Sequence, residues 1–249
     1  MPPTLGPATG IVQVHFAGVG LVRSGEVRQH GGMSTLTGQQ IADAALDGWT
    51  YLLGALQTRI RTPNFAAGLA LVNAIGAEAE RRDHHPDLDL RYTHVDVRLW
   101  SHDARGVTDR DVRLARAVSA LAAEAGLSTA HTGVSRLELA LDSPDFAAVL
   151  PFWRAVLAVE HLAGPGFGDE LRDPAGALPT VWFQESGRDE PRQRWHPDVW
   201  VDPVEVQPRI EAALAAGGTL VSDEAAPHFW VLADSDGNRV CLCTWQGRD

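Results

Sequence analysis

The chain reads Glu80-Arg81-Arg82-Asp83-His84-His85-Pro86 at the point that decides how its first half folds. Apolar residues recur at helical spacing over residues 65–79, and Asn64 is a suitable N-cap, so a helix is predicted from there to about Asp83. Pro86 disfavours helical geometry in the residue before it, which places the two adjacent histidines where the helix must end. Imidazole gives or takes a proton near neutral pH, so this helix end is a candidate for proton-transfer chemistry.

The histidine pair belongs to a longer pattern. Tyr92, His102 and Asp111 follow it at fixed distances, which gives E-x3-H-H-P-x5-Y-x9-H-x8-D. This pattern resembles the signature of the pterin-4a-carbinolamine dehydratases (4a-hydroxytetrahydrobiopterin dehydratases), and the resemblance covers residues 34–127. It implies a hydro-lyase that converts 4a-hydroxytetrahydrobiopterin to quinonoid dihydropterin and water, with no metal or other cofactor. Such an enzyme recycles the pterin cofactor of aromatic amino-acid hydroxylation.

The resemblance also implies roles for individual side chains. His84 and His102 are the expected proton-transfer pair, and His85 is expected to position the pterin. Four further residues are expected to bind the substrate, and these are Glu80, Asp83, Trp49 and Asp111. Asp111 has a second interpretation, because a carboxylate in the first turn of a helix is also favoured by the helix dipole. Two alternatives stay open for the three histidines, a solvated turn and a zinc site.

The polarity pattern of residues 34–127 predicts the order helix, two strands, helix, two strands, helix. Residues 94–100 alternate between polar and apolar side chains, which is typical of a half-buried strand. A helix is predicted from Asp109 to Ala125, ended by Gly126. Together with the resemblance, this pattern indicates an α+β fold with a four-stranded antiparallel sheet and helices on one face.

The first part of the chain lacks these features. Residues 1–32 are rich in glycine and show no clean periodicity, and Met33 is the only methionine besides Met1. We therefore expect translation to begin at Met33 and residues 1–32 to be a disordered or mis-annotated extension; the alternative is an ordinary flexible tail. The expected division is then a dehydratase-like domain over residues 33–127, a linker over 128–133 and a second domain over 134–249.

The second domain repeats one order of elements, a strand, a helix and three strands. The first copy is predicted at 134–142, 145–157, 158–162, 168–173 and 179–184, and the second at 196–202, 204–216, 218–221, 228–233 and 239–245. This doubled βαβββ pattern resembles the glyoxalase-like branch of the vicinal-oxygen-chelate superfamily. The stretches that carry the resemblance are Phe152-Trp153-x3-Leu157, the strand at 196–202 and the ending at 232–243.

In metal-dependent members of that superfamily, the ligands come from the first, fourth, fifth and eighth strands. His196 matches the fifth-strand position, but Ser135 stands at the first and Cys241 at the eighth, so no bound metal is expected. Strand parity places His196, Asp198 and Trp200 on one face, and six of the eight tryptophans lie in this half. A cup for a flat organic ligand is the hypothesis, with His196, Trp200 and Cys241 as its pocket residues and ordinary core tryptophans as the alternative.

Composition narrows the remaining classes of function. The net charge is -11, lysine is absent and no basic cluster occurs, which argues against nucleic acid and anionic membranes as partners. No apolar run approaches the roughly 20 residues of a membrane span. We expect a cytoplasmic protein that acts on a pterin substrate. The second domain is expected to bind an unknown small ligand, and a homo-oligomer is compatible with the sequence. The alternatives are a non-catalytic dimerisation or assembly protein on the dehydratase fold, and a binding or lyase function in the second domain.

Overall fold

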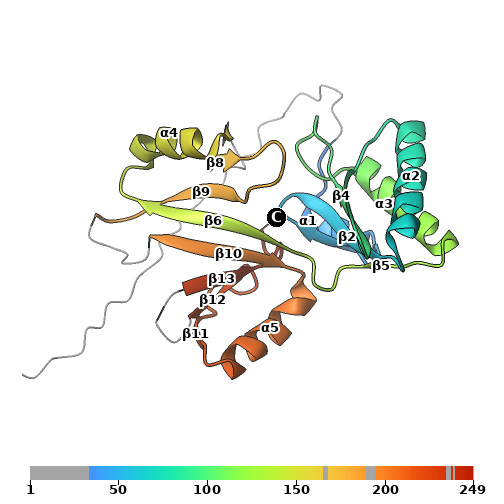
Figure 1. The fold of residues 1–249 in the computed structure, drawn as a ribbon. Coiled ribbons are helices and arrows are strands. Elements are labelled where there is room, and N and C mark those ends of the chain that lie inside the picture. Colours follow the sequence, from blue (N-terminus) through green and yellow to red (C-terminus); the bar gives the residue numbers. More distant parts are fainter. Residues whose placement is uncertain (1–33, 165–167, 189–193, 234–236, 238, 249) are drawn as a thin grey trace, which may run out of the picture. The chain divides into compact units, whose positions relative to one another are not determined.

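The computed structural model describes residues 34–164, 168–188, 194–233, 237 and 239–248 (Figure 1). The expected extension at 1–32 and the expected start at Met33 lie outside the described residues and stay predictions. Among the described residues, no helix has both the length and the apolar character that a bilayer crossing needs.

The first half of the structure is an antiparallel sheet with helices on one face, as predicted, but the sheet has five strands rather than the predicted four (Figure 1). Its strands follow the order β1-β2-β4-β3, and β5 pairs with β2. The elements in chain order are α1 (Gly38–Asp43), β1 (Thr50–Leu52), β2 (Ala55–Arg61), α2 (Phe65–Arg82), β3 (Asp87–Arg91), β4 (His94–Leu99), α3 (Asp109–Glu124) and β5 (Thr129–Ala130). β5 lies inside the expected linker, so part of that segment belongs to the first sheet, and the domain boundary itself stays a prediction.

Helix α2 ends in a way that directs the chain toward β3. Asp83 takes the left-handed conformation at φ 49°, and the backbone N–H of His84 donates back to the carbonyl of Ala79 at 3.2 Å. This is the hydrogen-bond pattern of a Schellman cap, and Asp is one of the few non-glycine residues that tolerate this conformation. The predicted helix end is therefore confirmed, and the cap sets the direction in which the two histidines leave the helix.

The core of this half lies between the sheet and the helices α2 and α3. Alternation along β4 buries Val95, Val97 and Leu99, while α2 and α3 supply the facing side chains. The buried helix residues are Leu71, Ile75, Val112, Leu114, Ala115, Val118 and Ala122. Phe65 and Leu69 also fall in the apolar stretch of α2 but are exposed, so only part of that stretch is core.

The second half forms one eight-stranded sheet in the order β11-β12-β13-β10-β6-β9-β8-β7. Its elements are β6 (Ser135–Ser143), α4 (Phe146–Leu157), β7 (Glu160–Gly164), β8 (Gly168–Arg172), β9 (Thr180–Glu185), β10 (Trp195–Val201), α5 (Pro203–Ala215), β11 (Thr219–Ser222), β12 (Phe229–Ala233) and β13 (Arg239–Cys243). The two βαβββ modules meet where β6 pairs antiparallel with β10, and each of these strands pairs in parallel with the last strand of its own module, β9 or β13. The predicted doubled pattern is confirmed.

The two faces of this sheet differ in polarity. Val201 of β10 and Leu242 of β13 pack with Val206 and Ile210 of α5 in one apolar cluster. Because side chains alternate along a strand, the even-numbered positions of β10 face the other way. That polar face is where the second candidate site lies.

A glycine tests how β5 docks on the first sheet. Gly48 has φ +74°, and a Cβ there would lie 2.4 Å from the backbone carbonyl oxygen of Thr129. Gly54, in the β1–β2 turn, has the same φ of +74° but no atom within 4 Å of such a Cβ.

Gly54→Ala should cost about 1–2 kcal/mol of unfolding free energy from backbone strain alone. Gly48→Ala should cost at least about 1 kcal/mol more, because the backbone of β5 must also move. Urea unfolding of both variants measures the difference, and equal losses would contradict the close packing of β5.

Candidate functional site

A buried carboxylate stands at the centre of the motif. Asp111 has 0% of its surface exposed and accepts four hydrogen bonds. The donors are His84 Nε2 at 2.7 Å, Ser101 Oγ at 2.7 Å, the Thr108 backbone N–H at 2.7 Å and the Thr108 hydroxyl at 3.1 Å. A carboxylate this deep needs such partners, since a buried polar group without them costs several kcal/mol. Asp111 therefore connects three segments that are distant in the sequence.

The hydrogen bond to Asp111 determines the tautomer of His84. A carboxylate that already accepts from an amide and hydroxyls also accepts from the imidazole, so Nε2 carries a hydrogen and Nδ1 is left to exchange a proton. The ring is 8% exposed, and the carboxylate fixes its orientation. This arrangement has the form of the histidine–aspartate pairs that orient a general base in other enzymes.

His102 comes to the same end of the β3–β4 hairpin as His84. Asp87 pairs with Arg98 in the register of the hairpin, so the residues before β3 and after β4 lie together. Ser101, the residue before His102, shares the carboxylate of Asp111 with His84. The His102 ring is exposed and packs against Trp100, with ring centroids 4.3 Å apart. The structure thus brings two of the three predicted catalytic histidines to one place.

The exposed side of the site holds the third histidine. His85 Nε2 lies 3.2 Å from Glu80 Oε1, and their side chains are 56% and 80% exposed. Glu80 is therefore placed to orient an imidazole. Asp83 caps α2 through its backbone, and its contact with substrate stays a prediction.

Two positions of the predicted set lie elsewhere. Trp49 is 6% exposed within the core cluster, and its indole N–H donates to Ser119 Oγ at 2.9 Å. It is a core side chain, and the expectation that it walls the pterin ring stays a prediction. Tyr92 lies in the turn between β3 and β4, at the end of the hairpin away from the histidines, and is 74% exposed. Asp111 is completely buried in the first turn of α3, which favours the structural interpretation of this carboxylate.

The sequence motif did not identify Ser101 or Thr108, although both donate hydrogen bonds to the Asp111 carboxylate. Thr108 and Asp111 form a capping box at the start of α3, with each side chain bonded to the backbone N–H groups at that helix end. The Thr-x-x-Asp spacing is a known signal of this cap and would have identified Thr108. Ser101 has no such local signal, since only the packing of β4 against α3 brings its hydroxyl to Asp111.

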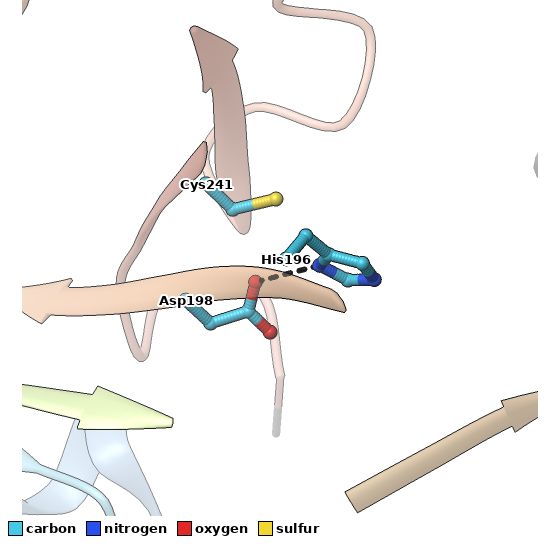
Figure 2. Close-up of side chains that lie close together, drawn as sticks. All are labelled: His196, Asp198 and Cys241. Carbon is cyan, nitrogen blue, oxygen red and sulfur yellow. Dashed lines mark hydrogen bonds and ion pairs between the residues drawn. The ribbon is translucent and has the colours of Figure 1, made fainter. Parts of the chain in front are cut away.

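The polar face of the second sheet holds a second cluster. In the strand register, Glu138 of β6 pairs with Asp198 of β10, and Asp198 pairs with Cys241 of β13. Figure 2 shows His196, Asp198 and Cys241 converging from two neighbouring strands. The distance between His196 Nδ1 and Asp198 Oδ1 is 3.3 Å. One donor atom from each of these three residues lies within 4.8 Å of the others, so they form a group able to hold a metal ion. Within the part of the chain that the structure describes, His84, His85 and His102 do not form such a group.

Carboxylates surround His196 on both sides of its ring. Burial by itself lowers the pKa of His196, but Asp142, Asp198 and Cys241 together raise that pKa to about 11. The Nε2 atom lies 3.7 Å from Asp142 Oδ1, which is the distance of an ion pair rather than a hydrogen bond. Without a ligand, His196 is therefore an imidazolium held between two acidic groups.

Two tryptophans donate hydrogen bonds to carboxylates of this sheet face. Trp182 donates to Asp198 Oδ2 at 3.2 Å, and Trp200 donates to Glu138 Oε2 at 2.8 Å. The Trp200 ring also lies 4.6 Å from the guanidinium carbon of Arg248. The structure thus brings together His196 and Cys241 of the predicted pocket and places Trp200 on the neighbouring carboxylate.

Comparisons with known proteins match the two halves separately. The family model described as pterin 4 alpha carbinolamine dehydratase matches residues 34–121, and the glyoxalase-like domain model matches residues 138–243. A protein of Mycobacterium avium (strain 104) is 41% identical over 92 residues, which are 36% of this chain and 97% of that protein. One of Aquifex aeolicus (strain VF5) is 38% identical over 79 residues, which are 32% of this chain and 80% of that protein. Both bear the inferred name pterin-4-alpha-carbinolamine dehydratase.

Solved structures also match each half. The transcriptional coactivator/pterin dehydratase of Brucella melitensis is 32% identical, covers 35% of this chain and 98% of its own, and gives a TM-score of 0.34. A glyoxalase/bleomycin resistance protein/dioxygenase superfamily member from Vibrio splendidus 12B01 is 14% identical, covers 45% of this chain and 99% of its own, and gives a TM-score of 0.32.

Glu138 makes the stability of the protein depend on pH. Burial raises the pKa of Glu138 to about 7 from 4.5, although the hydrogen bond from Trp200 acts in the opposite direction. The unfolded chain therefore loses this proton at lower pH than the folded one, and unfolding free energy should fall as pH rises from about 4.5 to about 7. Glu138→Gln should reduce this fall by up to roughly 3 kcal/mol. Denaturant unfolding across this pH range is the measurement, with exposed Glu160→Gln as the control. An unchanged slope in Glu138→Gln would contradict the shifted carboxyl.

Proposed function

Since the chain belongs to the pterin-4a-carbinolamine dehydratase family, we propose that its first domain dehydrates a 4a-hydroxytetrahydropterin to the quinonoid dihydropterin. The observation that carries this proposal is the buried Asp111 carboxylate, which holds His84 and the segment of His102 together. A scaffold protein has no need of an imidazole oriented in this way. We take 4a-hydroxytetrahydrobiopterin as the substrate, and recycling of the pterin cofactor of aromatic amino-acid hydroxylation as the role.

The reaction needs two proton transfers and no change of oxidation state. The C4a–O bond breaks, the departing hydroxyl takes up a proton and leaves as water, and N5 loses its proton as the C4a–N5 double bond forms. One group must therefore act as a general acid and another as a general base on a flat heterocycle. Imidazoles suit both tasks near neutral pH, and each such transfer contributes typically about 10²–10⁴-fold to the rate.

His84 is the base in this proposal. Its Nε2 hydrogen is engaged by Asp111, so Nδ1 is available to accept the N5 proton. The imidazolium that forms is stabilised by the same carboxylate, as a buried aspartate does for a catalytic histidine in other folds. Asp111 thus acts through His84 and does not touch the substrate.

His102 is the acid, and His85 positions the pterin. His102 is exposed, so a protonated ring can deliver its hydrogen to the departing hydroxyl, and Trp100 supports the ring from one side. His85 is also exposed and has Glu80 beside it, which suits a hydrogen bond to the polar edge of the pterin. All three imidazoles follow the end of α2 or the end of β4.

A second candidate function belongs to the second domain. The cluster of His196, Asp198 and Cys241 on its polar sheet face supports binding of a small ligand there. A non-catalytic assembly role for the first domain is the competing explanation of the dehydratase fold. It predicts that loss of the histidines leaves the protein's function untouched, so the activity experiment separates the two.

His84→Ala and His102→Ala should each lower dehydratase turnover at least about tenfold, because each removes one proton-transfer group. Stopped-flow dehydration of 4a-hydroxytetrahydrobiopterin by the full-length protein is the measurement. His94→Ala is the control, since His94 begins β4 at the opposite end of the hairpin and should keep full turnover. Wild-type turnover in a folded His84→Ala, His102→Ala double variant would exclude the proposed chemistry.

Asp111→Asn tests whether the carboxylate acts through His84. The amide keeps the volume but offers one acceptor oxygen to donors that engage two, so unfolding free energy should fall by about 1–3 kcal/mol. Turnover should fall in the wild-type background, while the same substitution should cost no further turnover in His84→Ala. A merely structural Asp111 predicts equal losses in both backgrounds, which the double-mutant cycle would reveal.

A further inference from the structure

We propose that Trp100, a residue outside the histidine motif, is the positioning residue of His102. This inference rests on the proposed function, in which His102 is the proton donor. The indole lies directly beside the imidazole, with ring centroids 4.3 Å apart and ring planes inclined by 51°. Trp100 acts through His102 and needs no contact of its own with the substrate.

His102 differs from the other two candidate histidines in what orients its ring. A carboxylate oxygen lies 2.7 Å from Nε2 of His84, and another lies 3.2 Å from Nε2 of His85. Within the part of the chain that the structure describes, the His102 side chain has no hydrogen bond and no ion pair, and its ring contact is with Trp100. An exposed side chain of this kind rotates about its torsions unless a neighbour restricts it. The indole is therefore the group that restricts the imidazole.

The backbone beside His102 is already fixed. The backbone N–H of Ser101 donates to the carbonyl of Gly106 at 2.9 Å, which closes the turn that contains His102. The Ser101 hydroxyl donates to the buried carboxylate of Asp111 at 2.7 Å. The side-chain torsions of His102 are thus the remaining freedom of the proton donor, and these are the torsions that a neighbouring ring controls.

The indole is itself held in place from the strand side. Arg98 and Trp100 are two residues apart, so they share one face as the alternation of β4 continues. The guanidinium carbon of Arg98 lies 5.1 Å from the centroid of the indole ring, which is within the range of a cation–π contact. Arg98 Nη1 in turn donates to Asp87 Oδ2 at 2.9 Å. A ring anchored in this way can hold a neighbouring imidazole in one orientation.

The indole N–H of Trp100 gives an independent indication that hydrogen bonding does not set the position of this ring. Trp49, Trp182 and Trp200 each donate their N–H to a side-chain oxygen, at 2.9, 3.2 and 2.8 Å. The N–H of Trp100 is buried and has no acceptor. A buried donor without an acceptor lowers stability, so such a group calls for another explanation of its placement. Contact of the ring with His102 supplies that explanation.

Stopped-flow dehydration by the full-length protein tests the role of Trp100. Trp100→Leu should lower kcat about three- to tenfold and leave KM within about twofold, because the proton donor is misplaced while the substrate contacts stay. Trp100→Phe should keep more than about half of the wild-type kcat, since a flat ring remains beside the imidazole. In the His102→Ala background, Trp100→Leu should cost no further turnover.

Trp245→Leu is the matched control. It removes another half-buried indole, from the second domain, and should keep wild-type turnover. Far-UV circular dichroism establishes that each variant is folded. If Trp100→Leu does not fold, Trp100→Thr replaces it, because threonine suits a strand end.

Proton NMR gives a readout that needs no turnover. The ring current of the indole should displace the resonances of the carbon-bound imidazole protons of His102, and Trp100→Leu should return them to ordinary positions. Absence of turnover in the wild-type protein would exclude the proposed function and this role with it. With an active wild type, an unchanged kcat in Trp100→Leu, equal losses in both backgrounds or unaltered His102 resonances would overturn the role of Trp100 alone.

Discussion

The carboxylate of Asp111 is the interaction on which the first domain depends. It is completely buried, and its hydrogen bonds come from the segment after α2, the end of β4 and the start of α3. Burial makes these bonds obligatory, because a carboxylate without partners in the protein interior is far less stable than one in water. The same bonds orient His84. The same hydrogen bonds therefore close the fold and orient the proposed base. This explains why a buried carboxylate belongs to the motif of the three candidate histidines.

In the second sheet, neighbouring charged groups rather than a full set of hydrogen-bond donors compensate the buried charges. Its polar face carries Asp142 and Asp198 close to one imidazole, with Glu138 opposite Asp198, and hydrogen bonds satisfy only part of this set. Desolvation raises the pKa of Glu138 to about 7, whereas the carboxylates around His196 raise the pKa of that imidazole to about 11. Where the first domain compensates one charge with four donors, the second balances several charges against each other. Groups with pKa values shifted in this way are typical of functional sites.

Periodicity and caps explain why most of the fold could be predicted. The end of α2 at Asp83, the alternation along β4 and the doubled βαβββ order all follow from local rules and are confirmed. Long-range packing accounts for what local rules did not predict. Trp49 lies in the core, and its indole N–H donates to Ser119 Oγ. The expected linker contains β5, because Thr129 and Ala130 pair with β2. No local sequence pattern predicts this pairing.

The sequence by itself determined which side chains are candidates for chemistry. The spacing from Glu80 to Asp111 identified the histidines, and strand parity placed His196 and Asp198 on one face. Only the tertiary structure decided which of these groups meet. Ser101 and His84 share Asp111 because β4 and α2 pack against α3, and Cys241 reaches Asp198 because β13 pairs with β10 in a particular register. Local preferences act over a few residues along the chain, whereas a hydrogen bond between distant segments exists only after the core has packed and excluded water around it.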